Sequence, residues 1–307
     1  MVGIKPLSKI WLDGRFLDWE KAQIHILTHG LHYGYAIFEG IRSHGTAQGP
    51  AIFRLKEHLT RFENSAKIYR MALPYSHAQL TEVAKELVRV NGVTDSYLRP
   101  LAFSGYGEMG LDPTRSPISV AMALWEWGAY LGEQSAQQGV RVTVSNWTRI
   151  DSRALPPQAK CAANYANSAL AKMQASAAGY DEAILLNASG MVAEGPGENV
   201  FRVKDGVLST PPASSGILRG ITRDSVIRFA RDEGIPFQRT DFTREELFTA
   251  DEVFFSGTAV GLTPIREVDG RPIGSGNYPV THRLQKVYDD AIHGRDPRYR
   301  AWLTPAG

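Results

Sequence analysis

The 307-residue chain contains a single cysteine, so no disulfide can form within it. This is typical of a reducing compartment, and we expect a cytoplasmic protein. Residues 1–13 lack the apolar core of a signal peptide. No apolar run approaches the roughly 20 residues that a membrane-spanning helix needs, so we expect no membrane partner.

Strong charge of either sign is also missing. The formal net charge is +2 at pH 7 and no run of lysine or arginine occurs, which argues against a nucleic-acid partner. No internal repeat or low-complexity segment is present. Hydrophobic residues make up 43% of the chain and charged residues 21%, as in a soluble globular enzyme of one large or two ordinary domains.

Two short motifs suggest a ligand, but their sequence context argues against one. His25, His29 and His32 have the spacing of one helix face, but no glutamate lies between them and no cysteine is near, so we expect no metal. Residues 105–110 match the glycine pattern of dinucleotide-binding loops. That pattern must open a helix, and the prolines at 113 and 117 prevent one here.

Periodicity and turn residues predict a mixture of helices and strands, and hence an α+β fold. Ser76 is a candidate N-cap for the second helix, and Thr222 for a later one. An aromatic and glycine-rich stretch suggests a domain boundary, with domains at 1–131 and 139–307 and a linker at 132–138. The expected helices are 55–66, 164–178, 216–233 and 280–293, together with a second helix after Ser76 whose apolar stripe is Leu80, Val83, Ala84, Leu87 and Val88. The expected strands include a hairpin at 10–16 and 96–103, 118–125, 140–144, 183–186, 192–193, 199–203 and 253–260.

Lys160 lies in a small, nearly uncharged stretch. Two prolines at 156 and 157 stop any helix from continuing through it, and Asn164 can cap the helix that follows. We therefore expect Lys160 on a short extended segment that points inward. Burial favours the neutral amine, a nucleophile able to form a Schiff base. The alternative is an ordinary surface lysine.

Glu194 ends an apolar strand and is followed by Gly195-Pro196-Gly197, a turn at which the backbone can approach a ligand closely. Two further places suit an anion. The first is the helix start near Ile221 and Thr222, where backbone amides lack acceptors. The second is the turn that ends in Thr258.

Together Lys160, Tyr165 and the segments 194–201 and 218–223 resemble the fold-type IV pyridoxal-phosphate enzymes of aminotransferase class IV. The closest resemblance is to bacterial branched-chain amino-acid aminotransferases and extends from about residue 10 to 293. Pro196 departs from the family pattern, which usually has a small residue there. The resemblance implies a small N-terminal α/β domain, a larger C-terminal domain with a mixed sheet or pseudo-barrel, and pyridoxal 5′-phosphate at the domain interface.

The resemblance also assigns roles in the cofactor site. Lys160 would carry the cofactor and move a proton at the substrate Cα, while Glu194 would keep the pyridine nitrogen protonated. Tyr165 would donate to the phenolic oxygen. The remaining cofactor-binding residues, most of them around the phosphate, would be Arg61, Leu218, Gly220, Ile221, Thr222 and Thr258.

A branched-chain enzyme must accept an apolar side chain and also the second carboxylate of glutamate or 2-oxoglutarate. The resemblance provides apolar walls, groups for the distal carboxylate, and groups for the α-carboxylate. Tyr33 and Phe38 can equally be core aromatics. The walls would be Phe38, Leu111, Trp127 and Tyr130, the distal carboxylate would meet Tyr33, Arg99 and Tyr130, the α-carboxylate would meet Tyr97, Thr258 and Ala259, and Gly40 and Met109 would complete the substrate site.

In the family the loop corresponding to 105–110 reaches the active site of a neighbouring subunit, so we expect a homodimer or a higher homo-oligomer. Rival activities in the same superfamily are a D-amino-acid aminotransferase, an (R)-amine transaminase and aminodeoxychorismate lyase. The segments 33–42, 97–100 and 127–130 favour transamination between L-leucine, L-isoleucine or L-valine and 2-oxoglutarate. Outside this class, the chain could bind a nucleotide or metal without transamination.

Overall fold

The computed structural model describes residues 4–128, 131–132 and 134–307. Its contacts divide the chain into two compact units. Unit 1 comprises Met1–Gly128, Ala159–Ala163 and Asp290–Gly307, and unit 2 comprises Ala129–Gln158 and Asn164–Asp289. Two segments that the sequence assigned to the C-terminal domain thus belong to unit 1. The physical reason is strand pairing, because Cys161 bridges Ile37 and the last strand pairs within the first sheet.

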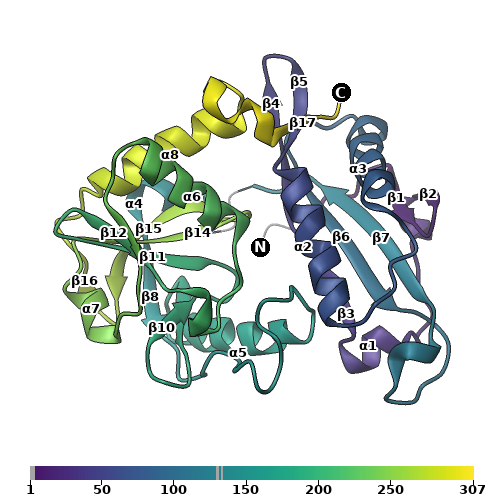
Figure 1. Cartoon of the computed structure of the whole chain (residues 1–307), viewed down its shortest axis with the longest axis horizontal. Helices are drawn as coiled ribbons and strands as arrows, with labels where there is room; N and C mark the ends of the chain where they lie inside the picture. The colour runs from purple at the N-terminus through teal and green to yellow at the C-terminus, as the bar shows by residue number, and fades with distance from the viewer. Residues whose placement is uncertain (1–3, 129–130, 133) are drawn as a thin grey trace. The chain divides into compact units, whose positions relative to one another are not determined.

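Unit 1 is built on an antiparallel sheet with the order β17-β5-β4-β6-β7-β1-β2, to which β3 adds by pairing with β6. Helices α2 and α3 pack against each other, and each contacts strands of this sheet (Figure 1). The elements of unit 1 are β1 Lys9–Leu12, β2 Arg15–Asp18, α1 His29–Tyr33, β3 Ala36–Phe38, β4 Ile41–Thr46, β5 Gly49–Phe53, α2 Leu55–Ile68, α3 His77–Asn91, β6 Ser96–Ser104, β7 Ile118–Trp125 and β17 Leu303–Pro305, with 3-10 turns at Trp19–Lys21, Pro113–Arg115 and Pro297–Trp302.

Local sequence explains several of these elements. Asp13 and Gly14 both have positive φ, which joins β1 to β2 as the Asp-Gly pair predicted. Leu59 and Phe62, three residues apart on α2, are fully buried in the core of the unit. Ser76 caps α3 in a capping box with Gln79, so the predicted N-cap is confirmed.

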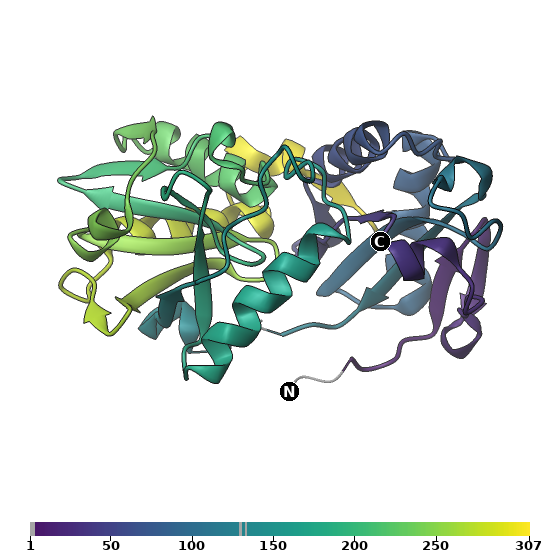
Figure 2. The same ribbon diagram turned by 90° about the horizontal axis from the view of Figure 1, so that it is seen from below.

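Unit 2 contains a strand ring that closes on itself. Strands follow the order β10-β9-β8-β15-β14-β11, and β10 also pairs with β11, so the ring is a barrel. Strand β8 runs parallel to both β9 and β15, whereas the other ring pairings are antiparallel. The expected mixed sheet or pseudo-barrel is confirmed. Strands β12 and β13 extend the sheet beyond β11, and α5, the teal helix in Figure 2, packs along β9.

The barrel is filled by apolar side chains that include Val142, Val200 and Phe255, all fully buried. Helix α6 begins at Ile221 and its N-cap is Gly220. The expectation that Thr222 caps this helix was wrong, because Gly220 already has extended backbone and accepts from Asp224. The elements of unit 2 are α4 Ser135–Gln138, β8 Val140–Val144, α5 Asn164–Ala177, β9 Glu182–Leu186, β10 Val192–Glu194, β11 Asn199–Lys204, β12 Val207–Thr210, α6 Ile221–Asp232, β13 Phe237–Arg239, α7 Arg244–Phe248, β14 Glu252–Gly257, β15 Gly261–Val268, β16 Arg271–Pro272 and most of α8 Pro279–Ile292, with a 3-10 turn at Ala213–Ser215.

Among the described residues, no helix combines the length and the apolar character that crossing a membrane requires.

The capping box of α3 can be tested directly. Ser76→Ala should lower the free energy of unfolding by about 1 kcal/mol, because the amide of Gln79 loses its acceptor. Urea denaturation measures this change. Thr60→Ala is the matched control: the Thr60 hydroxyl is exposed within α2 and donates only to the carbonyl of Lys56. An equal loss in both variants would contradict the capping argument.

Candidate functional site

The segment Ala159–Ala163 lies along β3. The amide of Phe38 donates to the carbonyl of Lys160 at 3.0 Å, and the amide of Ala162 donates to the carbonyl of Ala36 at 2.8 Å. Lys160 also donates its own amide to the hydroxyl of Ser65 on α2 at 3.0 Å. The expected extended segment is confirmed, and its backbone is held from two directions.

The Lys160 side chain is half-buried, with Nζ 5.0 Å from the centroid of the Phe38 ring. Gly34 allows the end of the Ala159–Ala163 segment to approach closely, since a Cβ at that glycine would lie 3.2 Å from the Cβ of Ala163. The alternative of an ordinary surface lysine is therefore not supported. The Lys160 amine therefore lies against an aromatic wall of unit 1.

The same Phe38 ring contacts a second cation. The guanidinium of Arg99 lies 4.7 Å from its centroid and 5.5 Å from the ring of Tyr97. Trp127 meets Tyr97 edge to face at 4.7 Å. The Nε of Arg99 is buried and has no hydrogen-bond partner among the described residues. Unit 1 therefore gathers apolar walls and a half-buried arginine around the Phe38 ring that Lys160 also contacts, which is the chemistry that both a hydrocarbon side chain and a carboxylate need.

Gly40 has a steric role in this group. A Cβ at position 40 would lie only 1.8 Å from the hydroxyl oxygen of Tyr97. Any larger residue would displace the tyrosine, so the glycine is required for this arrangement of rings.

Three further predicted substrate residues, Tyr33, Met109 and Leu111, lie on a different part of unit 1. The Tyr33 hydroxyl donates to the carbonyl of Met109 at 3.2 Å, so the 105–112 loop rests on α1. Tyr33 and Leu111 are largely exposed, Leu111 by 80%. Neither is a core residue in this unit, so the core interpretation of Tyr33 is wrong. Tyr130 lies outside the described residues.

Arg61 is held by a buried acid that sequence reasoning missed. Its Nε and Nη2 donate to the two carboxylate oxygens of Glu39 at 2.7 and 2.8 Å, and His58 lies 2.7 Å from the same carboxylate. Burial alone would raise the pKa of Glu39, but the charge and hydrogen bonds of Arg61 outweigh it and hold that pKa well below its ordinary value. Glu39 therefore stays ionised and fixes the guanidinium plane of Arg61.

In unit 2, Glu194 is a buried carboxylate surrounded by donors. Arg149 pairs with it at 2.8 Å, the side-chain amide of Asn199 donates at 2.9 Å, and the backbone amide of Leu218 donates at 3.0 Å. Arg149 and Glu194 are each 6% exposed in their side chains. These donors stabilise the charged carboxylate, which is what pairing with a protonated ring nitrogen requires.

Asn199 connects Glu194 to the start of α6. Its amide also donates to the carbonyl of Leu218 at 2.9 Å, and a Cβ at Gly220 would lie 2.0 Å from its Oδ1. Gly220 must therefore be small. The first helical bond of α6 is donated by Asp224, so the amides at 222 and 223 have no acceptor within the helix and can bind an anion.

Three further predicted residues belong to unit 2. Thr258 and Ala259 form the turn between β14 and β15, as the sequence indicated. Tyr165 is half-buried in the first turn of α5. The structure thus describes the predicted cofactor residues in two groups, Lys160 and Arg61 in unit 1 and the others in unit 2.

Sequence reasoning missed Glu39, Arg149 and Asn199 as positioning residues. Asn199 had a signal, since it lies in the same short motif as Glu194 and its side chain can reach back across one turn. Glu39 precedes the recognised Gly40, but only the contact with α2 reveals its function. Arg149 has no local signal, because its pairing with Glu194 spans 45 residues of chain and depends on the barrel.

A third buried acid follows the Gly195–Gly197 turn. The Glu198 carboxylate accepts from the amide of Gly197 at 3.0 Å, while the neighbouring acid Glu182 pairs with Lys172 at 2.9 Å. Burial, together with the charge of Glu182, raises the pKa of Glu198 to about 8. Glu198 is therefore protonated near neutral pH, next to the turn that carries Glu194.

Comparison with known proteins places these features in one family. The model of the family described as amino-transferase class IV matches residues 36–268. The branched-chain-amino-acid aminotransferase of Pseudomonas aeruginosa is 45% identical over 296 residues, which is 96% of either chain. The branched-chain amino acid aminotransferase of T.th. with pyridoxamine 5′-phosphate superposes with a TM-score of 0.96 at 50% identity, covering 99% of this chain and 100% of that one. Its complex with N-(5′-phosphopyridoxyl)-L-glutamate gives 0.95 at 48% identity, with the same coverage.

The buried Glu198 predicts a pH dependence of stability. In the unfolded chain this carboxyl ionises at its ordinary pKa of 4.5, whereas in the folded chain it ionises at about 8. Between these values the folded state holds a proton that the unfolded state has lost, so the contribution of Glu198 to stability falls as the pH rises and is constant above about 8.

Glu198→Gln should therefore stabilise the chain relative to the parent progressively more from pH 5 to pH 8, as measured by urea denaturation at each pH. Glu82→Gln, an exposed change on α3, is the control and should show no such trend. A difference between E198Q and the parent that is the same at the two ends of this range would refute the assignment.

Proposed function

The chain belongs to the amino-transferase class IV family, and we propose that it is a pyridoxal-phosphate-dependent branched-chain amino-acid aminotransferase. It exchanges an amino group reversibly between L-leucine, L-isoleucine or L-valine and 2-oxoglutarate. The observation that carries this proposal is the Phe38 ring, which contacts both Lys160 and Arg99. A nucleophilic amine and a carboxylate-binding cation share one apolar wall, as an enzyme for both leucine and glutamate requires.

The residues present suit the cofactor. Glu194, buried and supplied with donors, matches a protonated pyridine nitrogen, and the open amides at the start of α6 match a phosphate. When bound, pyridoxal phosphate supplies the electron sink that makes the substrate α-proton acidic. Glu194 keeps the ring nitrogen protonated, and Arg149 and Asn199 keep Glu194 charged and oriented.

Lys160 has two tasks in this proposal. Its Nζ would hold the cofactor, and as a base it would accept and return the proton at the substrate Cα. The backbone bonds of Lys160 to Phe38 and Ser65 fix where that nitrogen can reach. Tyr165 donates to the phenolic oxygen of the cofactor.

The phosphate is proposed to be bound by charge and by backbone amides together. Arg61 supplies the positive charge, and its two hydrogen bonds to the Glu39 carboxylate orient its guanidinium. Leu218, Gly220, Ile221, Thr222 and Thr258 supply the amides, hydroxyls and close backbone approach.

Substrate recognition uses the same aromatic group. Phe38, Trp127, Leu111, Met109 and Tyr130 surround the hydrocarbon side chain, and Arg99 with Tyr33 and Tyr130 takes the distal carboxylate of glutamate. Tyr97, whose position depends on Gly40, binds the α-carboxylate with the Thr258–Ala259 backbone.

We further propose that the active assembly is a homo-oligomer. Ile26, Leu31, Tyr106 and Leu111 are all more than half exposed, and they belong to α1, the segment before it, and the loop that rests on it. An apolar surface of this kind suits a second copy of the chain.

The single cysteine, Cys161, is buried and free, which supports a cytoplasmic location.

A kinetic panel tests the activity. The purified protein with pyridoxal phosphate should absorb visible light, and the absorption should change when L-leucine is added. Turnover with L-leucine and 2-oxoglutarate should exceed turnover with D-alanine or (R)-phenylethylamine. Lys160→Ala should abolish turnover, with a loss of several orders of magnitude, because the proton at Cα then has no acceptor.

Faster turnover of D-alanine or (R)-phenylethylamine than of L-leucine would replace the proposed substrate class within the same family. A colourless protein, or unchanged turnover in K160A, would overturn the cofactor assignment itself. Lys85→Ala, an exposed change on α3, serves as the control for the loss of one lysine.

Arg99 offers a separate test of substrate recognition. Arg99→Met keeps an apolar side chain of similar length but removes the charge, so KM for 2-oxoglutarate should rise by roughly 10- to 100-fold, as expected for losing a charged hydrogen bond. KM for L-leucine should change much less. Arg89→Met on α3, whose side chain is 66% exposed, is the control. Equal changes in KM for 2-oxoglutarate and for L-leucine would show that Arg99 does not bind the distal carboxylate.

A further inference from the structure

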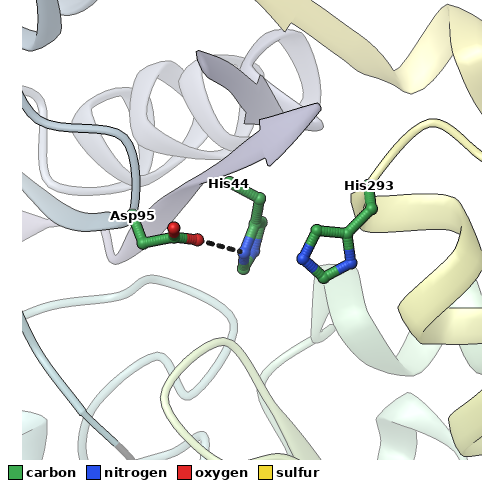
Figure 3. Close-up of side chains that lie close together, drawn as sticks. All are labelled: His44, Asp95 and His293. Atoms are coloured by element: carbon green, nitrogen blue, oxygen red, sulfur yellow. Dashed lines mark ion pairs between the residues drawn. The ribbon is translucent and has the colours of Figure 1, made fainter. Parts of the chain in front are cut away.

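Three side chains far apart in the sequence come together in unit 1, and none of them is assigned to the cofactor or substrate site above. His44 lies on β4, Asp95 directly precedes β6, and His293 follows α8 (Figure 3). One potential ligand atom from each lies within 4.8 Å of the others. In the close-up, the His44 ring stands between the Asp95 carboxylate and the His293 ring.

Asp95 does not hydrogen-bond His44 directly. His44 Nδ1 and Asp95 Oδ1 are 3.6 Å apart, which is longer than a hydrogen bond. The rings of His44 and His293 are edge to face, with their centroids 5.7 Å apart.

Burial of His44 is a second, independent observation. The residue is 7% exposed, and its Nε2 is buried without a hydrogen-bond partner among the described residues. Buried polar atoms nearly always have a partner, and a bound ion can be that partner where no protein group is.

The surrounding chain holds these side chains in place. The Ser43 hydroxyl donates to the carbonyl of Thr94 at 2.8 Å and lies 2.6 Å from the hydroxyl of Ser96, so Asp95 is flanked by two anchored residues. Gly294, with φ of +70°, packs so that a Cβ would lie 3.1 Å from Leu303 of β17. His293 is therefore fixed next to a segment that pairs with the sheet.

Two of the proposed ligands lie near the surface. His293 lines a pocket together with Thr46, Gly294 and Arg300. Asp95 is exposed and supplies a negative charge 3.6 Å from His44.

We propose that His44, Asp95 and His293 form a binding site for one divalent transition-metal ion of the zinc type, with water as the fourth ligand. Two imidazoles and one carboxylate are ligands that Zn²⁺ accepts. His293 belongs to the C-terminal segment Asp290–Gly307, whereas His44 lies on β4 and Asp95 directly precedes β6. The ion therefore links that segment to the sheet of unit 1.

Zn²⁺ itself is the probe. The holoenzyme, treated with chelator and dialysed, is titrated with Zn²⁺ by calorimetry, and its unfolding temperature is followed at each concentration. We expect one Zn²⁺ per chain and a rising unfolding temperature, because the ion binds only the folded state. Asp95→Asn and His293→Gln should each weaken binding by more than about tenfold, the least that losing a direct ligand costs.

His282→Gln, an exposed histidine at the start of α8, is the matched control and should bind Zn²⁺ like the parent. Asp95 is exposed, so the D95N variant should fold, and its visible absorption with pyridoxal phosphate verifies this. Co²⁺ in place of Zn²⁺ should give visible bands with nitrogen and oxygen ligands that are absent in D95N. Absence of saturable binding, or equal binding in D95N, H293Q and the parent, would overturn the site.

Discussion

The pairing of five residues, Ala159–Ala163, with β3 is the constraint on which the rest of unit 1 depends. The backbone hydrogen bonds of this pairing place Lys160 over Phe38. Such bonds constrain the path of the chain more tightly than the contacts of a flexible side chain do. On its other edge β3 pairs with β6, where Phe38 lies opposite Leu101. Arg99 lies two residues before Leu101 on β6, so its side chain is on the same face of the sheet as Phe38 and diagonally opposite it. The strand register therefore brings the guanidinium to the Phe38 ring.

Closure of the barrel has the same effect in unit 2. Strand β10 pairs with β9 and also with β11, and the second pairing sets Asn199 opposite Glu194. The amide of Asn199 then donates both to the carboxylate and to the carbonyl of Leu218, which leads into α6. The pairing of β10 with β11 therefore positions both Glu194 and the start of α6. Gly220, which has no side chain, leaves room for the side chain of Asn199.

Three buried acids, Glu39, Glu194 and Glu198, show how neighbouring donors and charges determine whether a buried carboxyl group is ionised. Glu39 meets an arginine fork and a histidine, and it remains ionised despite complete burial. Glu194 meets an arginine and amide donors. Glu198 has one backbone donor and a neighbouring acid, so burial dominates and it holds a proton. Burial is the same in each case, and the number and charge of the donors make the difference.

The sequence by itself determined the features that depend on neighbours along the chain. The Asp13-Gly14 turn, the Ser76 cap, the extended segment at Lys160 and most helices and strands follow from local turn chemistry and periodicity. The tertiary structure decided what depends on partners distant in sequence. It assigned Ala159–Ala163 and the C-terminal segment to unit 1, paired Arg149 with Glu194, and gathered His44, Asp95 and His293, because strand register and packing cannot be read from one segment.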